Sequence, residues 1–211
     1  MKTLFIAGAT GKTGRACLTK ALDAGFTVQA LVRNPQKLEV KHERLTVVEG
    51  DILDEAAVAR AMQGCDAVLS VFGHVKGSPE WLQTNGTRNI VNVMKKLGIR
   101  RIVSLSGGGL PYPEKDKPKL VDHLIRGLMR LAVPKVLNDA IAHHRVLEES
   151  GTDWTIVRGP RLTLEPARGT YRVGWVGVNA STSISRYDLA DFLLAQLDDR
   201  TYLHQMPFVS Y

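Results

Sequence analysis

The sequence predicts a single α/β domain with a doubly wound parallel sheet. Short apolar runs alternate with longer stretches of helical periodicity along the 211 residues, and no linker divides them. A glycine-rich turn also follows the first apolar run, where a strand would pass into a helix. Such alternation builds right-handed β-α-β crossovers, so the expected strand order is 3-2-1-4-5-6.

Six apolar runs are expected to form the strands. Each is short and bounded by polar or glycine-containing segments, as is typical of strands buried on both faces. The runs span residues 4–7, 27–32, 45–49, 67–71, 101–105 and 154–157. The helices expected between them span residues 12–24, 55–63, 80–97 and 138–150. Gly25, Gly98 and Gly151 follow three of these helices, in the position that a helix C-terminus favours.

The glycine-rich turn has the sequence Gly8-Ala9-Thr10-Gly11-Lys12-Thr13-Gly14. Glycines at a strand-to-helix turn permit a tight bend and close approach to phosphate, and the helix N-terminus offers free N–H groups. The spacing is Gly-x-x-Gly-x-x-Gly, which an ordinary tight turn also tolerates. Because a whole strand-helix-strand unit surrounds it, the turn indicates a dinucleotide pyrophosphate site. The expected contacts are Gly8, Thr10, Gly11, Lys12, Thr13 and Gly14.

The end of the second predicted strand indicates which dinucleotide is bound. A site that prefers NAD usually offers an acidic residue to the ribose hydroxyls here, and this chain has Arg33 instead. Arginine can form a bidentate contact with the 2′-phosphate of NADP, and Lys37 adds a second positive charge in the next turn. An ordinary surface arginine is the alternative. Because the motif determines the position of Arg33, the sequence favours NADP(H).

Two further strand ends carry candidate cofactor contacts. Asp51 and Ile52 follow the third run, where the adenine is expected, although Asp51 is equally suited to cap the next helix. Val71, Phe72 and Gly73 close the fourth run, where a glycine lets the backbone approach the ribose. All of them lie at carboxyl ends of strands, which is the edge where ligands bind in this architecture.

The fifth run ends in a serine and a glycine-rich loop. Ser106, followed by residues 107–109, is a candidate for polarising a substrate or holding the nicotinamide carboxamide, and a serine that satisfies loop backbone is the alternative. The segment 106–118 is rich in glycine and proline, and we expect a functional loop rather than a domain boundary. A Tyr-x-x-x-Lys pair, which transfers a proton in many dehydrogenases, is missing, because Lys115 follows Tyr112 at the wrong spacing.

Residues near the sixth run complete the expected pocket. Pro160 and Arg161 follow this run, and Arg161 is suited either to an anionic substrate group or to the surface. His143 and His144 are adjacent and so lie on different faces of one helix. His144 is a candidate acid facing the cleft, although a satisfied or solvated histidine fits better. Neither has a carboxylate or cysteine at ligand spacing, so we expect no metal site.

The last part of the chain has a different pattern. Glycines interrupt the apolar positions of residues 171–178, which indicates a hairpin or an edge strand, and residues 188–197 are typical of a final helix. Too little chain remains for an independent domain. We therefore expect one domain over residues 1–211, in which residues from about 160 to 211 form a small cap on the substrate side.

The net charge of +7 raises the possibility of a nucleic-acid partner. The positive residues concentrate in one region and include Lys115, Lys117, Lys119, Arg126, Arg130 and Lys135. Interleaved aromatics and a known binding motif are missing, so a solvated basic face that steers an anionic cofactor or substrate fits better than nucleic acid.

The cellular setting is inferred from cysteines and apolar segments. Cys17 and Cys65 are too few for a disulfide framework and are expected to be core residues in a reducing compartment. The first apolar run is broken at once by glycines, so it is a strand rather than a signal peptide. No apolar segment is long enough to span a bilayer. We expect a cytoplasmic protein without a membrane partner.

Together these motifs resemble the atypical short-chain dehydrogenases/reductases, in the group that includes biliverdin-IXβ reductase/flavin reductase and the NmrA-like proteins. The resemblance covers nearly the whole chain and depends on residues 8–14, 31–33, 50–51, 85–91, 144–151 and 185–189. It implies a Rossmann fold and assigns the glycine-rich turn to phosphate binding, Arg33 and Lys37 to the 2′-phosphate, and Asp51 and Ile52 to the adenine.

The same resemblance places Ser106 beside the nicotinamide and Tyr112 at the pocket mouth, where flavin reductases carry a large aromatic residue. Two positions depart from the family pattern. Gly107 replaces a second hydroxyl, and Arg161 replaces a histidine-like residue after Pro160. These departures concern the substrate rather than the cofactor.

The resulting functional hypothesis is an NADPH-dependent reductase that transfers hydride to a planar small-molecule acceptor such as a flavin, a quinone or a tetrapyrrole-like compound. The expected assembly is a monomer or a small homo-oligomer. An NADP(H)-binding redox sensor without turnover is the alternative, and the missing Tyr-x-x-x-Lys pair favours it. An epimerase or isomerase is a weaker third hypothesis.

Overall fold

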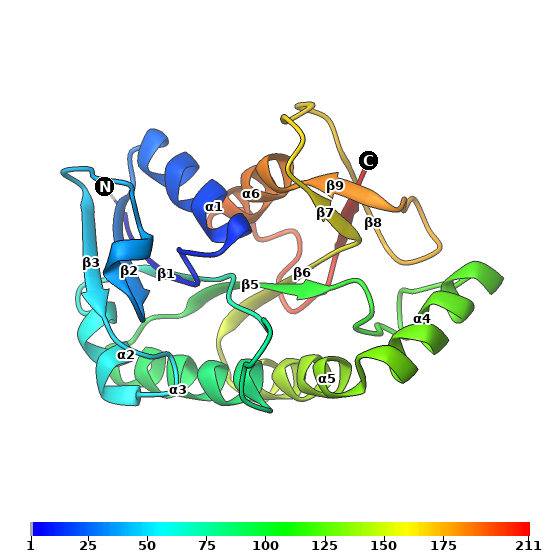
Figure 1. The fold of residues 1–211 in the computed structure, drawn as a ribbon, viewed down its shortest axis with the longest axis horizontal. Helices are drawn as coiled ribbons and strands as arrows, with labels where there is room; N and C mark the ends of the chain where they lie inside the picture. The colour runs from blue at the N-terminus through cyan, green and yellow to red at the C-terminus, as the bar shows by residue number, and fades with distance from the viewer. Residues whose placement is uncertain (1) are drawn as a thin grey trace.

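The computed structural model describes residues 2–211, without the side chains of residues 125, 126 and 129, and has three layers (Figure 1). The strands of the central layer are β1 (Thr3–Ala7), β2 (Thr27–Val32), β3 (Leu45–Glu49), β4 (Ala67–Ser70), β5 (Arg101–Gly107), β6 (Asp153–Gly159), β8 (Arg172–Gly174) and β10 (Phe208–Ser210). Their order is β3-β2-β1-β4-β5-β6-β10-β8, and only the β10–β8 pair is antiparallel.

Helices cover both faces of this sheet. On one face α1 (Lys12–Asp23) packs beside α6 (Arg186–Ala195), and on the other lie α2 (Glu55–Met62), α3 (Leu82–Leu97) and α5 (Pro134–Glu148) (Figure 1). Between β5 and α5, α4 (Leu120–Ala132) extends beyond the end of the layer (Figure 1). None of the helices in the described part of the chain is long and apolar enough to cross a membrane.

The core follows from the alternation of side chains along each strand. In β1, Leu4 and Ile6 join the cluster under α1 and α6, whereas Phe5 and Ala7 join the cluster on the opposite face. Cys17 and Cys65 are buried and free, as expected of core residues. Burial raises the pKa of each thiol to about 12, so both remain protonated and unreactive.

The predicted strand order 3-2-1-4-5-6 is confirmed, and β2 and β3 have the predicted bounds. Four elements were not predicted: α4, β10, and the small parallel pair of β7 (Arg161–Thr163) and β9 (Ser183–Ser185). The three missed strands are three residues long, too short to show a period of two.

The expected cap over residues 160–211 needs correction. Strands β8 and β10 extend the central sheet, and α6 packs with α1 in a helical layer. The β7–β9 pair and the segment around Val176 and residues 181–182 lie beside the carboxyl ends of the strands. This part of the chain therefore both completes the domain and lines the binding edge, where it also contributes Arg186 and Phe208.

A buried ion pair holds the loop between β5 and α4 against β6. The Arg158 guanidinium donates to both carboxylate oxygens of Asp116 at 2.8 Å and to the Leu110 carbonyl at 2.8 Å. The side chains of Arg158 and Asp116 are 0% and 3% exposed. Asp116 also accepts from the backbone N–H groups of Tyr112 and Val176. The glycine- and proline-rich segment is therefore an ordered loop, not a boundary.

Candidate functional site

The glycine-rich turn has the geometry of a phosphate-binding loop. Gly8 has φ +93°, a conformation that L side chains rarely adopt, and a Cβ on Gly14 would lie 2.0 Å from the Gly8 carbonyl oxygen. Gly14 therefore lets α1 pack directly on the turn. The N-cap of α1 is Gly11, which gives the first-turn N–H groups no side-chain acceptor. An anion at this helix end would satisfy them.

A cavity of about 610 Å³, here called the glycine-loop cavity, lies over this turn at the carboxyl ends of the strands. Eleven residues expected to contact cofactor line it: Gly8, Thr10, Gly11, Lys12, Thr13, Arg33, Asp51, Ile52, Val71, Phe72 and Gly73. The lining residues that were not expected are Leu31, Val32, Gly50, His74, Val75, Leu82, Leu162 and Arg186. Gly14 supports the turn from α1.

A second cavity, of about 360 Å³ and here called the cationic cavity, is lined by Thr10, Arg33, Asn34 and Lys37. A third cation lies beside it, because Arg15 of α1 donates to the Lys37 carbonyl at 2.8 Å. Among the described residues, its lining contains no carboxylate. The donors present suit a phosphate dianion, and Arg15 was missed because nothing in its local sequence marks it.

The adenine contacts differ in part from expectation. Asp51 lines the glycine-loop cavity, but it accepts from Leu53 N at 2.9 Å and does not cap α2. The cap is Asp54, which accepts from Ala56 N at 2.9 Å. The capping alternative for Asp51 is therefore wrong.

The cavity wall formed by Ile52 and Phe72 is supported from behind by α3. A Cβ on Gly86 would lie 2.8 Å from the Phe72 ring and 3.0 Å from Ile52. The two apolar side chains therefore pack directly against the α3 backbone, which gives a flat ring a rigid surface on which to lie.

His74 and Asp139 form a pair that sequence reasoning missed. His74 follows β4 and lines the glycine-loop cavity, and its Nε2 lies 2.6 Å from Asp139 Oδ2. Asp139 is fully buried in α5 and also accepts from Gln83 N and from the N–H and hydroxyl of Thr84. Burial opposes ionisation of Asp139, but these hydrogen bonds outweigh it and lower the pKa. An ionised carboxylate behind a histidine fixes the orientation of the ring.

Ser106 has a buried hydroxyl that lacks a partner. The residue is 6% exposed, and its Oγ makes no hydrogen bond within the part of the chain that the structure describes. It lies at the end of β5, opposite Arg158 of β6. The alternative, a serine that satisfies loop backbone, is therefore wrong. An unpaired buried hydroxyl costs free energy that a bound polar group would recover.

Below Ser106 a buried histidine joins β5 to α3. His143 Nδ1 lies 2.8 Å from Thr87 Oγ1, and its Nε2 lies 3.1 Å from Ser104 Oγ. Burial lowers the pKa of His143 to about 4, so the ring is neutral near pH 7. The satisfied histidine expected from the sequence was His144, and no local sequence pattern indicates these partners of His143.

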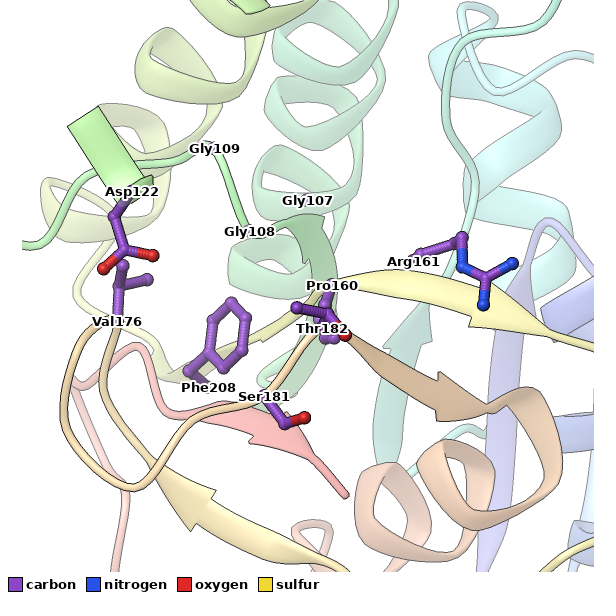
Figure 2. A pocket seen from close by; sticks show the side chains of 11 residues that line it. Gly107, Gly108, Gly109, Asp122, Pro160, Arg161, Val176, Ser181, Thr182 and Phe208 are labelled. Atoms are coloured by element: carbon purple, nitrogen blue, oxygen red, sulfur yellow. The ribbon is translucent and has the colours of Figure 1, made fainter. Parts of the chain in front are cut away.

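A third cavity, of about 450 Å³ and here called the apolar cavity, opens at the ends of β5 and β6. Its lining residues are Gly107, Gly108, Gly109, Asp122, Gly159, Pro160, Arg161, Val176, Ser181, Thr182 and Phe208 (Figure 2). Figure 2 shows Phe208, Val176 and Asp122 around one space, whereas the Arg161 guanidinium extends away from them. Pro160, expected at the cofactor, lines this cavity instead.

Two expected substrate residues lie elsewhere. Tyr112 packs edge-on against Trp175 at 5.6 Å, with the Arg158 guanidinium 5.7 Å from its ring centre. His144 packs against Trp154, with ring centres 5.5 Å apart, and its burial lowers its pKa. Neither residue lines any of the three cavities. Their assignment to the substrate is corrected, because each ring is used in packing.

Arg186 reaches the glycine-loop cavity from the start of α6. Its Nη1 donates to the Leu162 carbonyl at 2.6 Å, and its buried Nε has no partner among the described residues. Burial lowers its pKa, which is the cost of holding a guanidinium out of water. The residue supplies an additional cation to the cavity. No local sequence signal marked it, since the rest of the lining lies far away in the chain.

These cavities fit an NAD(P)-type dinucleotide. Uncapped N–H groups and Arg186 suit the pyrophosphate, and the donors of the cationic cavity suit a further phosphate. A family model described as NAD(P)H-binding matches residues 8–200 of the chain.

Two reductases and one solved structure are similar to this chain. Cinnamoyl-CoA reductase 1 of Petunia hybrida is 32% identical over 134 residues, which cover 57% of this chain and 40% of the relative. A (4-alkanoyl-5-oxo-2,5-dihydrofuran-3-yl)methyl phosphate reductase of Streptomyces griseus is 26% identical over 93% of this chain and 59% of its own length. The chain thus spans about two fifths and three fifths of these relatives.

The solved structure is a short-chain dehydrogenase/reductase of Veillonella parvula in complex with NADP. It superposes with a TM-score of 0.79 at 19% identity and covers 100% of this chain and 94% of its own. At this identity the likeness concerns the fold, and the family match concerns the cofactor class. The chain belongs to this NAD(P)H-binding family and has a Rossmann-like fold.

Proposed function

We propose that the protein is an NADPH-dependent reductase that transfers hydride to a planar, mostly apolar acceptor such as a flavin, a quinone or a tetrapyrrole-like compound. One observation carries this proposal: the glycine-loop cavity and the apolar cavity lie along the same edge of the sheet, and the consecutive residues Leu162 and Arg161 of β7 line one each. A dinucleotide in the glycine-loop cavity would extend along this edge toward a ring in the apolar cavity.

The preference for NADPH is supported by charge. Arg33 and Lys37 line the cationic cavity and Arg15 lies next to it, whereas an NAD site would need a carboxylate at the end of β2. Without a bound anion, the positive charges of Arg15, Arg33 and Lys37 repel one another, and a phosphate in the cationic cavity would reduce this repulsion. NADP(H) is therefore the better ligand for this site.

The acceptor class follows from the walls of the apolar cavity. About 450 Å³ is within the usual range of small-molecule pockets. Glycine backbone at residues 107–109 and Gly159 leaves flat walls, and Phe208 and Val176 add apolar surface. Asp122 supplies a carboxylate. Such a site favours a flat ring system with few charges.

Bound NADPH would supply the hydride, and the chain's own residues would bind, orient and manage the proton. The Ser106 hydroxyl does not line the three cavities, but it has no partner among the described residues and precedes Gly107 of the apolar cavity, so it would bond a ligand that reaches the end of β5. His74, oriented by the ionised Asp139, would present its ring to a ligand in the glycine-loop cavity as a hydrogen-bonding group. The apolar walls exclude water from the hydride path. This arrangement needs no Tyr-x-x-x-Lys pair.

The named activities of the two relatives support a reductase, and their acceptors are not carried over, because the chain spans only part of each. Membership of the biliverdin-IXβ reductase/flavin reductase and NmrA-like group stays a prediction. So do the cytoplasmic location and the assembly as a monomer or small homo-oligomer.

Steady-state oxidation of NADPH and NADH with flavin, quinone and tetrapyrrole acceptors tests the proposal. We expect turnover with at least one class and a kcat/KM for NADPH roughly tenfold or more above that for NADH. Binding of NADP(H) without turnover on the whole panel would overturn the reductase and favour the redox sensor. In that event, capture of partners with NADP and with NADPH would be compared.

A further inference from the structure

Helix α4 presents an apolar stripe to solvent. Its exposed apolar side chains range from 58% to 89% exposed and are Leu120, Val121, Leu124, Leu128 and Leu131. Exposed side chains of this size are normally scattered, and here they share one short helix. The stripe is therefore a surface feature that the fold of the domain does not require.

The geometry of the helix directs this stripe away from the protein. At 100° per residue, Leu120, Leu124, Leu128 and Leu131 fall within an arc of about 80°. Asp122, which lines the apolar cavity, lies on roughly the opposite side of the helix. Figure 1 shows α4 extending beyond the end of the layered body, with one side free.

Positive charge flanks the stripe along the chain. Lys115, Lys117 and Lys119 lead into α4, Arg130 lies in its last turn, and Lys135 follows it. The Lys115 ammonium also lies 5.7 Å from the centre of the Trp175 ring. Arg126 also belongs to this group in sequence, but its side chain lies outside the described residues.

The nearby carboxylates are largely engaged. Asp116 is paired with Arg158, and Asp122 accepts from the backbone N–H of Lys119 at 2.8 Å and faces the apolar cavity. Glu80 pairs with Lys135 at 3.3 Å, on exposed side chains where the pair is weak. Glu114 is the remaining acidic residue of the segment. The rim of the stripe is therefore positive.

We propose that α4 is an interfacial helix that docks the protein reversibly on a bilayer containing anionic phospholipid. Leucines on one face and lysines and arginines around them are the features of helices that lie in a membrane surface. Apolar side chains would enter the acyl boundary, and the rim would meet the lipid phosphates. The net charge of +7 would attract the whole protein to such a surface.

A second copy of the chain is a poorer occupant for the same face. Pairing around a two-fold axis would place the positive rim of one copy against the same rim of the other. Like charges at that distance oppose association, whereas an anionic bilayer neutralises them. Charge complementarity therefore favours an anionic membrane over a second copy of the chain as the partner of this face. The expectation of no membrane partner depended on the lack of a spanning segment, which does not bear on a surface helix.

Docking through α4 would place the apolar cavity behind the membrane-bound helix, because Asp122 lines this cavity from the side of α4 opposite the stripe. This inference is independent of the proposed reductase activity, since it depends on surface side chains alone. It adds a lipid partner that the cavities do not predict.

The test is cosedimentation of the full chain with vesicles of phosphatidylcholine alone and of phosphatidylcholine mixed with phosphatidylglycerol. We expect pelleting with the anionic vesicles and release by high salt. Substituting Leu124→Glu together with Leu128→Glu should reduce the partition coefficient by roughly tenfold or more. Because both side chains are exposed, thermal melting of this variant should match that of the wild type.

Matched controls separate the stripe and the rim from general effects of charge. Val47→Glu with Leu164→Glu alters two exposed apolar residues outside α4 and should bind like the wild type. Lys117→Glu with Lys119→Glu should also weaken binding roughly tenfold. Lys41→Glu with Lys95→Glu makes the same change in net charge elsewhere and should weaken it much less.

Three results would overturn the proposal. The first is no pelleting of the wild type with anionic vesicles, or undiminished pelleting of the Leu124→Glu, Leu128→Glu variant. The second is equal binding to neutral vesicles, which would exclude the role of the rim. The third is a wild-type protein that is a dimer by sedimentation velocity, does not bind vesicles, and becomes monomeric in the Leu124→Glu, Leu128→Glu variant. That result would assign the stripe to contact with a second copy of the chain.

Discussion

At the ends of β1 and β2, the binding residues come from one stretch of chain, residues 8–37, and consist of backbone N–H groups and cations at the surface. At the ends of β5 and β6, the apolar cavity takes its walls from α4 and from segments as distant as Val176 and Phe208, held by the buried Arg158–Asp116 pair. Local backbone geometry thus builds the first region, and tertiary packing builds the second. The second should therefore be far more sensitive to changes in the core.

The largest effect is expected from Asp116→Asn. The substitution leaves the Arg158 guanidinium buried without its counter-charge, which typically costs about 3–5 kcal/mol. Urea unfolding would measure the lost free energy. The double substitution Asp116→Leu with Arg158→Met removes both charges and should recover much of the loss. A loss below about 1 kcal/mol for Asp116→Asn would show that tertiary packing of this loop does not depend on the pair.

Acid should destabilise the protein through His143. Its pKa is about 4 when folded and 6.5 when unfolded, so below pH 6.5 the unfolded state binds more protons. Stability from this group is complete above pH 6.5 and falls as the pH falls to 4, by roughly 3 kcal/mol in all. The free energy of unfolding is measured between pH 4 and pH 7 for the wild type and for His143→Gln. The difference between the two pH profiles gives the contribution of His143.

His144→Gln is the matched control for this pH dependence. The neighbouring ring is only half-buried, so its removal should change the slope much less. Equal slopes for wild type and His143→Gln would contradict a neutral buried histidine beneath the apolar cavity.

The surface region is addressed by Arg33→Ala with Lys37→Ala. Removal of two cations from the cationic cavity should raise the KM for NADPH by roughly 10- to 100-fold and leave that for NADH nearly unchanged. Stability should not change, because this region is not held by buried charge. Arg60→Ala on α2, an exposed arginine outside the cavities, is the control. An equal rise in both KM values would contradict a 2′-phosphate contact.

The smallest effect is expected from Ser106→Ala. Its hydroxyl has no partner among the described residues, so the melting temperature should stay the same or rise slightly. If the hydroxyl bonds a ligand, kcat should fall by roughly tenfold. Thermal melting and steady-state rates are measured on the same preparation. A clear loss of stability would mean that the hydroxyl is satisfied within the protein.

The contrast between the two regions also explains what the sequence could predict. The strand order and the turn from Gly8 to Gly14 are encoded by local patterns, and so is the position of Arg33 at the end of β2. The His74–Asp139 pair joins residues 65 positions apart, and Arg186 reaches its cavity from α6. Contacts between residues so far apart in the chain leave no local sequence pattern from which they could be predicted.

The misplaced residues have related causes. Tyr112 and His144 were assigned to the substrate by type and by resemblance, but their rings are used in packing on Trp175 and Trp154. Helix α4 escaped prediction because prolines at 118 and 134 flank it and its apolar stripe faces solvent rather than the core. Hydrophobic periodicity can predict a helix, but it does not predict which face of the helix packs against the rest of the protein.

The position of β10 has a consequence for the order in which the protein is made. Residues 208–210 enter the sheet between β6 and β8, so the sheet has an internal gap until the ribosome has translated these residues. Strands β1 to β4, with α1 and α2, need none of these residues for their own pairing. The nascent chain would therefore possess its phosphate-binding turn long before its apolar cavity. Leu162 and Arg186, which also line the glycine-loop cavity, would join that turn only later.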